Sequence, residues 1–442
     1  MNARYLAEYA WLGGPVPVAD VLIEVIGDRI ATVRPGWAPG PAERSAITLP
    51  GLTLPGLANV HSHAFHRALR GRTHGGRGTF WTWRESMYAL AQRLDPDSYH
   101  RLARAVYAEM ALAGITAVGE FHYLHHAPGG DRYADPNAMG HALVAAAAEA
   151  GIRLTLLDTV YLTSTVDGDY LRGPQLRFGD GDLDGWASRA GALQTGPGAR
   201  RGTAIHSVRA LPGELIGDFV PLAEGLPLHV HLSEQRAENE ACQARYGCSP
   251  TELLHTYGAL GPGTTAVHAT HLSDVDRSLL GDTDTSVCLC PTTERDLADG
   301  IGPARALADA GSALCLGSDS HAMIDMFEEA RAVELDERLR TERRGHFPVD
   351  ELLLAATASG HRAIGWPDAG RISEGHRADL VTVDLSSVRT AGAEPLTAAV
   401  FAASPADVTQ VLVDGRPLVV DGRHATLDVA RELSAAIAAV QP

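Results

Sequence analysis

The sequence predicts an α/β protein in which a TIM-type (β/α)8 barrel carries a small β-sandwich domain built from both termini. Three observations lead to this prediction. Eight strand-like runs alternate with mostly helical stretches through the middle of the chain. Short β-hairpin patterns stand at both ends. The 442 residues are 45% hydrophobic, which is ample for one large core.

The hairpin patterns define the composite β-domain. Near the start, residues 21–26 and 29–33 are apolar runs on either side of the turn pair Gly27-Asp28. The corresponding segments near the other end are 378–385 and the pair 408–413 and 416–420, which flank Asp414-Gly415. We therefore assign residues 1–53 and 376–442 to this domain.

Residues 54–375 are predicted to form the barrel. Its strands are expected at 54–65, 115–122, 152–162, 202–208, 227–232, 264–269, 285–290 and 313–318. The clearest helices are expected at 98–113, 137–150 and 249–257. Two Gly-rich segments, 72–79 and 167–184, are expected to be loops, the second of them a surface excursion.

The charge composition excludes several kinds of chemistry. All 37 basic residues are arginine, so the chain has no lysine for a Schiff base, a phosphate loop or a carboxylated bridge between two metals. With 54 acidic residues the net charge is −17, which argues against nucleic-acid binding. A small anionic substrate held by local arginines remains compatible with this balance.

The expected location is the cytoplasm. Five cysteines, an odd number in a long chain, favour buried thiols over disulfides. The first twenty residues lack the basic start and apolar middle of a signal peptide. No apolar run approaches the ~18 residues of a membrane span, so we expect no membrane association.

The strongest chemical signal is the pair His61 and His63 at the end of the first barrel strand. Residues two apart on a strand point to the same face, so both imidazoles would enter the barrel mouth together. His231, His268 and Asp319 stand at the ends of the fifth, sixth and eighth strands. We expect His61, His63, His231 and Asp319 to bind one divalent metal ion, with zinc favoured by the ligand types.

The other histidines are expected to be structural or on the surface. His229 lies one pleat deeper than His231, and His271 lies beyond the sixth strand. A further group follows the second strand: His122, His125 and His126.

A divalent ion at this site would make hydroxide available from bound water, so the expected reaction is hydrolysis at an sp² carbon. This reaction requires acid–base groups beside the metal site. Glu234 lies three residues after His231 and could take the proton of the attacking water and then return it to the leaving group. Asp319 could share that proton as a ligand carboxylate. His268 could polarise the electrophile.

Motifs spread over nearly the whole chain resemble those of the amidohydrolase superfamily: Pro55-Gly-Leu-Ala-Asn-Val-His-Ser-His63, His231-Leu-Ser-Glu234, His268 and Gly317-Ser-Asp319. The absence of lysine agrees with its mononuclear deaminase branch. Three further strings resemble the formimidoylglutamate deiminases of that branch: Phe80-Trp-Thr-Trp-Arg-Glu, Glu120-Phe-His-Tyr-Leu-His-His126 and His206-Ser-Val-Arg209.

The resemblance implies hydrolysis of N-formimidoyl-L-glutamate to N-formyl-L-glutamate and ammonia in histidine degradation, by a homodimer. It implies that Arg84, Tyr123, His206 and Arg209 hold this amino-acid-derived substrate. Independently, a guanidinium fork matches a carboxylate bidentately, and the substrate has two carboxylates. His66 stands where the family usually has glutamine, and it could contact the substrate in a different geometry.

Two other functions are compatible with these residues. One is another aminohydrolase of the same fold, acting on a purine, pterin or triazine ring, which would not need Arg84 and Arg209 as carboxylate clamps. The other is a non-catalytic barrel that binds an anion, which would leave Glu234 and the metal ligands without a role.

Overall fold

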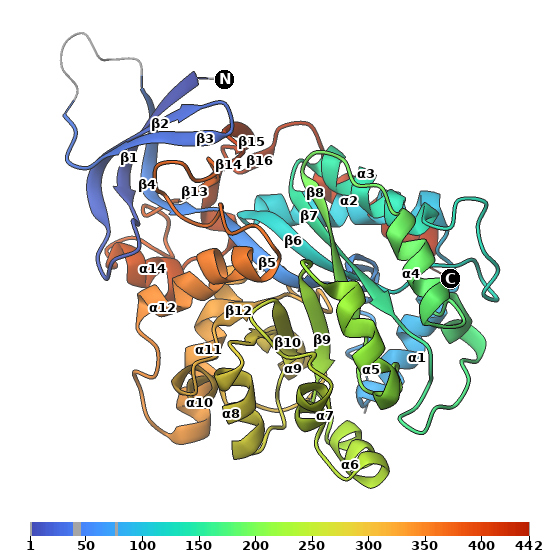
Figure 1. Ribbon diagram of the computed structural model, residues 1–442. Helices are drawn as coiled ribbons and strands as arrows, with labels where there is room; N and C mark the ends of the chain where they lie inside the picture. Colours follow the sequence, from blue (N-terminus) through green and yellow to red (C-terminus); the bar gives the residue numbers. More distant parts are fainter. Residues whose placement is uncertain (1, 39–45, 76–77, 442) are drawn as a thin grey trace.

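The computed structural model describes residues 2–38, 46–75 and 78–441 and contains two eight-stranded sheets (Figure 1). One is the parallel barrel sheet, with strand order β12-β11-β10-β9-β8-β7-β6-β5. The other joins both ends of the chain in the order β16-β15-β14-β13-β4-β1-β2-β3. The predicted fold class is confirmed.

Barrel strands follow the chain order. They are β5 (Leu57–Ser62), β6 (Ile115–His122), β7 (Arg153–Val160), β8 (Ala199–Ile205), β9 (Leu228–Leu232), β10 (Thr264–His268), β11 (Ser286–Leu289) and β12 (Leu314–Leu316). Neighbours pair in parallel from β5 to β12, and a parallel bridge between Ser62 and Asp319 joins the two edges. This closure places the first and last strands side by side.

Helices alternate with the barrel strands, and most of them lie around the outside of the barrel (Figure 1). They are α1 (Phe80–Ala91), α2 (Pro96–Leu112), α3 (Ala138–Ala150), α4 (Leu183–Ala192), α5 (Gly213–Phe219), α6 (Arg236–Tyr246), α7 (Pro250–Thr256), α8 (Asp274–Asp282), α9 (Pro291–Asp296), α10 (Ala304–Asp309), α11 (Met326–Thr341), α12 (Val349–Leu354) and α13 (Gly360–Ala363). Local signals explain several starts: Asp95 caps α2 by accepting the Ser98 N–H, and Ser249 caps α7 by accepting that of Glu252.

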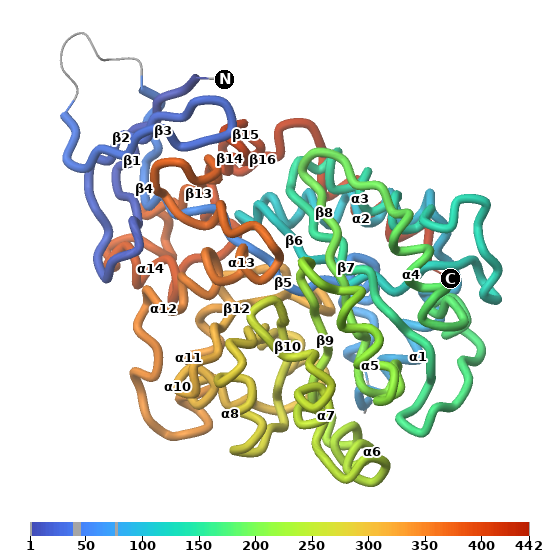
Figure 2. The backbone as a smooth tube through the Cα atoms, in the orientation of Figure 1, coloured from blue at the N-terminus to red at the C-terminus, as the bar shows by residue number. Residues whose placement is uncertain are grey.

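The terminal sheet brings distant parts of the chain together (Figure 2). Its strands are β1 (Asn2–Ala10), β2 (Val18–Ile26), β3 (Arg29–Arg34), β4 (Ile47–Pro55), β13 (Leu380–Val383), β14 (Val408–Val413), β15 (Arg416–Val420) and β16 (Arg423–His424). β4 pairs with β13 and so joins the two halves. After this sheet, α15 (Val429–Val440) returns to the barrel and packs on α2, where Arg104 pairs with Glu432.

Two predicted segments differ from the structure. The run 54–65 is split, because β4 continues to Pro55 in the terminal sheet and β5 starts at Leu57. Gly56 lies between them, where a Cβ atom would stand 2.8 Å from the Asp379 side chain. The excursion at 167–184 is not wholly on the surface: Arg177 is fully buried and donates to the backbone carbonyls of Leu94 and His126.

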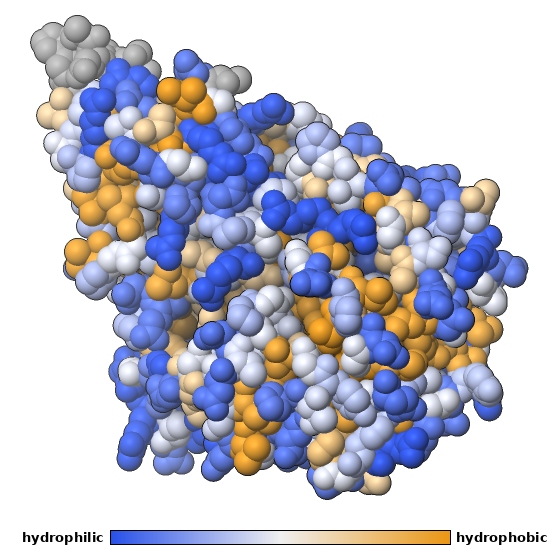
Figure 3. Space-filling model, viewed as in Figure 1, coloured by the Kyte–Doolittle hydropathy of each residue, from blue (hydrophilic) through white to orange (hydrophobic). Residues whose placement is uncertain are grey.

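Hydrophilic side chains are spread over both the terminal sheet and the barrel, with hydrophobic residues in separate groups between them (Figure 3). Among the residues that the structure describes, no helix is long and apolar enough to cross a membrane.

A buried ion pair fastens the barrel to the terminal sheet. Arg153, at the start of β7, directs both terminal nitrogens to the carboxylate of Asp379, which immediately precedes β13. Each residue is 1% exposed. Asp379 also accepts the Asp414 N–H at 2.9 Å. Burial by itself would raise the pKa of Asp379, but the Arg153 charge and the hydrogen bonds from Arg153 and the Asp414 N–H together outweigh burial and lower it.

We expect Asp379→Asn to lower the free energy of unfolding by about 3–5 kcal/mol, because it leaves the Arg153 charge buried and poorly paired. Since the folded-state pKa of Asp379 is depressed, its contribution is present at neutral pH and is lost as pH falls through that pKa. The variant should therefore lose less stability on acidification than the parent. Urea unfolding at neutral pH and near pH ~3, below the ordinary aspartate pKa of ~3.9, measures both effects. Asp218→Asn, the same change at an exposed carboxylate, is the control.

Candidate active site

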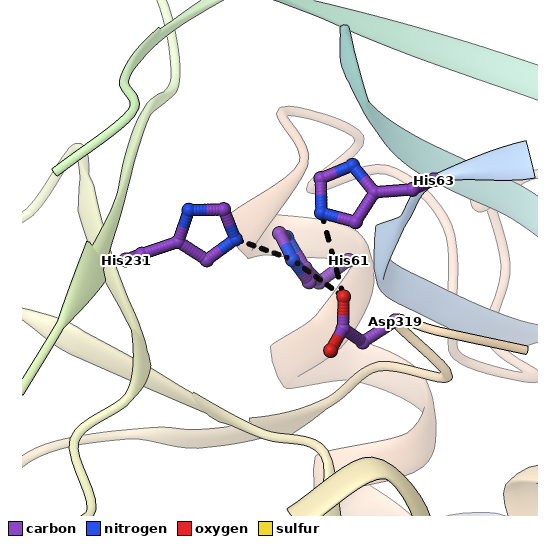
Figure 4. A group of neighbouring side chains, drawn as sticks. All are labelled: His61, His63, His231 and Asp319. Carbon is purple, nitrogen blue, oxygen red and sulfur yellow. Dashed lines mark hydrogen bonds and ion pairs between the residues drawn. The ribbon is translucent and has the colours of Figure 1, made fainter. Parts of the chain in front are cut away.

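Four predicted metal ligands meet at the carboxyl end of the barrel (Figure 4). His61 belongs to β5 and His63 follows it directly, His231 belongs to β9, and Asp319 lies just beyond β12. Gly317 allows this convergence, since a Cβ atom there would stand 2.7 Å from His61 Cβ. The barrel closure between β5 and β12 therefore builds the site.

The ligand atoms face one another. His61 Nε2 is 3.1 Å from His231 Nε2 and 3.3 Å from Asp319 Oδ1, and His63 Nε2 is 3.4 Å from the same oxygen. All four ligand atoms lie within 4.8 Å of one another, and all four residues are buried.

Hydrogen bonds from the backbone set the histidine tautomers. His63 Nδ1 donates to the Phe121 carbonyl at 2.9 Å, and His231 Nδ1 donates to the His206 carbonyl at 2.8 Å. Both histidines therefore turn the lone pair of Nε2 toward the centre of the group.

Electrostatics give each ligand its metal-binding form. Burial lowers the pKa values of His61, His63 and His231, which keeps the imidazoles neutral. Burial would raise the pKa of Asp319, but its hydrogen bond to His61 and the nearby histidines hold that pKa below its usual range. Neutral imidazoles around an ionised carboxylate fit a divalent cation, which would also resolve the close approach of two Nε2 lone pairs.

Glu234 and His268 lie beside this group. Glu234 Oε1 is 4.0 Å from His268 Nε2, and His268 Nε2 is 3.9 Å from Asp319 Oδ2. Burial raises the pKa of the Glu234 carboxyl to about 7. A carboxyl with such a pKa can both accept and donate a proton near neutral pH.

Strained backbone surrounds the site. Ser233, His268, Asp319 and His321 have φ values of 51°, 69°, 39° and 55°, although none is glycine. All four lie at or just after the carboxyl ends of barrel strands. Such strain persists only where surrounding structure enforces it, and it is concentrated at functional sites.

The predicted substrate residues line one pocket over the metal ligands. They are His66, Arg84, Tyr123, His206 and Arg209, and they share it with Glu234, His268 and Asp319. Arg84 lies on α1, in the first βα connection, and not at a strand end. The remaining wall is largely aromatic and apolar, with Phe80, Trp83, Met87, Tyr88, Tyr161, Phe178 and Leu297.

Each of the two arginines is held through its Nε. Arg84 Nε donates to the Tyr88 hydroxyl at 2.6 Å, and Arg209 Nε donates to Glu238 Oε2 at 2.8 Å. Among the described residues, the terminal nitrogens of both guanidinium groups have no hydrogen-bond acceptor in the chain. Both forks can therefore receive a ligand carboxylate.

His66 stands between the ligands and the aromatic wall. Its ring is 4.6 Å from the His63 ring, and its Nε2 is 3.1 Å from the Tyr123 hydroxyl. Burial lowers the pKa of His66 to about 3, so the ring is neutral. Its buried Nδ1 has no partner in the described chain.

Sequence reasoning missed the carboxylates that support the site. Glu120 accepts from Ser62 Oγ at 2.5 Å and from Ala64 N–H at 2.7 Å, on either side of His63. Glu294 lies 3.4 Å from His268 Nδ1 and accepts the Cys290 N–H. No sequence pattern predicts a role for Glu238 or Glu294, because the side chains they contact, Arg209 and His268, lie in other βα units.

The histidines expected to be structural lie outside the ligand group. His229 Nε2 contacts the Ala363 carbonyl inside the barrel, and His126 pairs with Asp180 at 3.0 Å. His122 and His125 pack against each other at 4.8 Å between ring centres.

Comparison with known proteins agrees with this geometry. The model of the amidohydrolase family matches residues 52–418. The chain belongs to the amidohydrolase family. The match includes every residue of the metal-ligand group and of the pocket.

Similar curated proteins include two from Pseudomonas aeruginosa. A formimidoylglutamate deiminase is 37% identical, with 92% of both chains covered. An 8-oxoguanine deaminase is 30% identical, with 95% of this chain and 92% of the relative covered.

Among solved structures, an amidohydrolase from Brucella melitensis superimposes with a TM-score of 0.91 at 32% identity, over 99% of both chains. An adenosine deaminase from Xanthomonas campestris with bound zinc gives 0.85 at 25% identity, over 99% of this chain and 97% of its own.

We expect elemental analysis of the purified protein to find about one divalent ion per chain, because four ligands complete one site. His231→Ala should retain only a small fraction of that metal. His255→Ala, at an exposed position on α7, should retain all of it. Two stoichiometric ions, or full metal content in His231→Ala, would contradict the mononuclear site.

Proposed function

We propose that this protein hydrolyses N-formimidoyl-L-glutamate to N-formyl-L-glutamate and ammonia, a step of histidine degradation. The observation that carries the proposal is the pair Arg84 and Arg209, whose terminal nitrogens are open to ligands in a pocket that also holds Glu234. Two guanidinium forks match the two carboxylates of this substrate. The relative from Pseudomonas aeruginosa named for this activity supports it.

His61, His63, His231 and Asp319 would hold the metal ion, and zinc is the ion that their donor atoms favour. When bound, a divalent ion of this kind lowers the pKa of water from ~16 to near 7, so that hydroxide is available at neutral pH.

The chain's own residues then supply proton transfer and orientation. Glu234 removes a proton from the attacking water and delivers one to the nitrogen that departs as ammonia. His268 Nε2 is 4.0 Å from Glu234 Oε1. It donates a hydrogen bond to the oxygen that adds to the formimidoyl carbon as the tetrahedral centre forms. Arg84 and Arg209 hold the carboxylates and thereby direct the formimidoyl carbon toward the metal ligands.

The surrounding aromatic side chains restrict water around the reacting group. Trp83, Tyr161 and Phe178 line the pocket together with the two arginines. Fewer competing waters strengthen the hydrogen bonds between guanidinium and carboxylate.

A ring-deaminating activity is the second candidate. The aromatic wall could stack on a purine, and the 8-oxoguanine deaminase relative favours this alternative. A ring without carboxylates would leave the terminal nitrogens of Arg84 and Arg209 without a carboxylate acceptor.

A substrate panel assayed for ammonia distinguishes the two. We expect efficient release from N-formimidoyl-L-glutamate and much slower release from guanine, 8-oxoguanine, adenosine and guanidino acids. Each carboxylate clamp should contribute ~2–5 kcal/mol when its partner is present, or more than tenfold in kcat/KM. Preferential turnover of a neutral ring would contradict the proposal.

We expect Glu234→Gln to lower kcat by at least ~10²-fold, because the amide keeps the shape but cannot carry a proton between water and leaving group. Metal content should be unchanged. Single-turnover assays with matched metal loading measure the effect, and Glu224→Gln, at an exposed position before β9, is the control. Near-normal turnover in Glu234→Gln would remove this residue from the mechanism.

A further inference from the structure

We propose that Glu238 is a positioning residue that orients the Arg209 guanidinium for one substrate carboxylate and ties this clamp to the turn that carries Glu234. The inference rests on the proposed function, since it assumes a substrate with a carboxylate at Arg209. It concerns a residue on α6 that does not line the substrate pocket.

The two oxygens of Glu238 have different partners. Oε2 accepts from Arg209 Nε at 2.8 Å, and Oε1 accepts the Ser233 backbone N–H at 3.1 Å. Glu238 therefore contacts Arg209 through a single hydrogen bond to Nε, and not through the two-pronged arrangement with two guanidinium nitrogens. The terminal nitrogens of Arg209 are thus left for a ligand.

The same contacts join three elements. Arg209 follows β8, Ser233 follows β9, and Glu238 lies in the first turn of α6. Ser233 has a φ of 51° and immediately precedes Glu234. Glu238 therefore links the backbone turn that aims the acid–base residue to the side chain that receives the substrate.

The hydrogen bond between Glu238 and Arg209 is largely shielded from water. The Glu238 side chain is 3% exposed and that of Arg209 is 16% exposed. Burial would lower the pKa of Arg209, but the Glu238 charge, its hydrogen bond and the other nearby acidic groups together outweigh burial and raise it, so the guanidinium stays charged. A charge-assisted hydrogen bond in such surroundings fixes orientation more firmly than one in water.

The other clamp shows what the carboxylate adds. Arg84 Nε is held by the neutral Tyr88 hydroxyl, and among the described residues no carboxylate pairs with its guanidinium. At Arg209 the neighbouring negative charge offsets the guanidinium, and recognition depends on the direction of the terminal N–H groups. Loss of Glu238 should therefore weaken binding at Arg209 through misorientation, although it removes a negative charge from the neighbourhood of an anionic substrate.

A double-mutant cycle tests the proposal. The variants are Glu238→Gln, Arg209→Met and the combination of both, with Glu240→Gln on the same helix as a control at an exposed carboxylate. Three substrates are compared: N-formimidoyl-L-glutamate and its two analogues that lack either the α-carboxylate or the side-chain carboxylate. Metal content and melting temperature are measured for each variant.

We expect Glu238→Gln to raise KM for N-formimidoyl-L-glutamate about tenfold or more, with a smaller change in kcat. One of the two analogues should be nearly insensitive to the change, namely the one that lacks the carboxylate held by Arg209. In the Arg209→Met variant, adding Glu238→Gln should lower kcat/KM only slightly further, because both changes remove the same interaction. Glu238→Asp should restore part of the loss by returning the charge.

Two outcomes contradict the proposal in different ways. If the effects of Glu238→Gln and Arg209→Met multiply, or if kcat falls equally for all three substrates, Glu238 acts only by supporting the Ser233 turn and the inference is wrong. If the unaltered protein does not turn over N-formimidoyl-L-glutamate, the proposed function fails, and the inference fails with it.

Discussion

The closure of the barrel between β5 and the end of β12 is the constraint on which the site depends. Asp319 exchanges backbone hydrogen bonds with the β5 strand, donating to the His61 carbonyl at 3.0 Å and accepting from His63 N–H at 3.4 Å. The backbone pairing that completes the barrel thus also brings the carboxylate against both histidines. Gly317 is required because any side chain there would collide with His61. Stability of the fold and assembly of the metal site therefore share the same hydrogen bonds.

Buried carboxylates form a second layer that holds the reactive groups in place. Glu120 receives hydrogen bonds from both sides of His63, Glu238 joins Arg209 to Ser233, and Glu294 approaches His268. Each of the three also accepts at least one backbone N–H close to a residue in a strained or loop conformation. A buried carboxylate with several donors resists reorientation, because a lost hydrogen bond in the interior is not replaced by water. Glu238 holds the Ser233 backbone and Glu294 approaches the His268 ring, so this layer supports two of the strained positions.

An all-arginine complement of basic residues suits this architecture. Arg153 fastens the barrel to the terminal sheet, Arg177 joins the end of α1 to the loop after β6 through three backbone carbonyls, and Arg84 and Arg209 face the substrate pocket. Arg153 and Arg177 each make several directed contacts, and Arg84 and Arg209 use Nε within the chain and keep their terminal nitrogens for a ligand. An ammonium group on a flexible stem offers no such fork. Arginine thus serves both in the buried framework and in the substrate pocket. Its burial and the acidic groups beside it determine which of the two roles each arginine has.

The sequence by itself predicted the barrel, the composite sheet and a metal-ligand set of His61, His63, His231 and Asp319, which the structure brings into one group, and it named five substrate residues that lie in one pocket. It could do so because strand periodicity places His61 and His63 on one face and the fold gathers strand ends at one mouth. Tertiary structure alone decided which neighbours restrain those groups. Glu238 meets Arg209 and Glu294 meets His268 only because separate βα connections pack together, and such contacts follow no local spacing. The position of Arg84 on α1, the burial of Arg177 and the division of the first predicted strand at Gly56 were decided in the same way, by packing between segments distant in the chain.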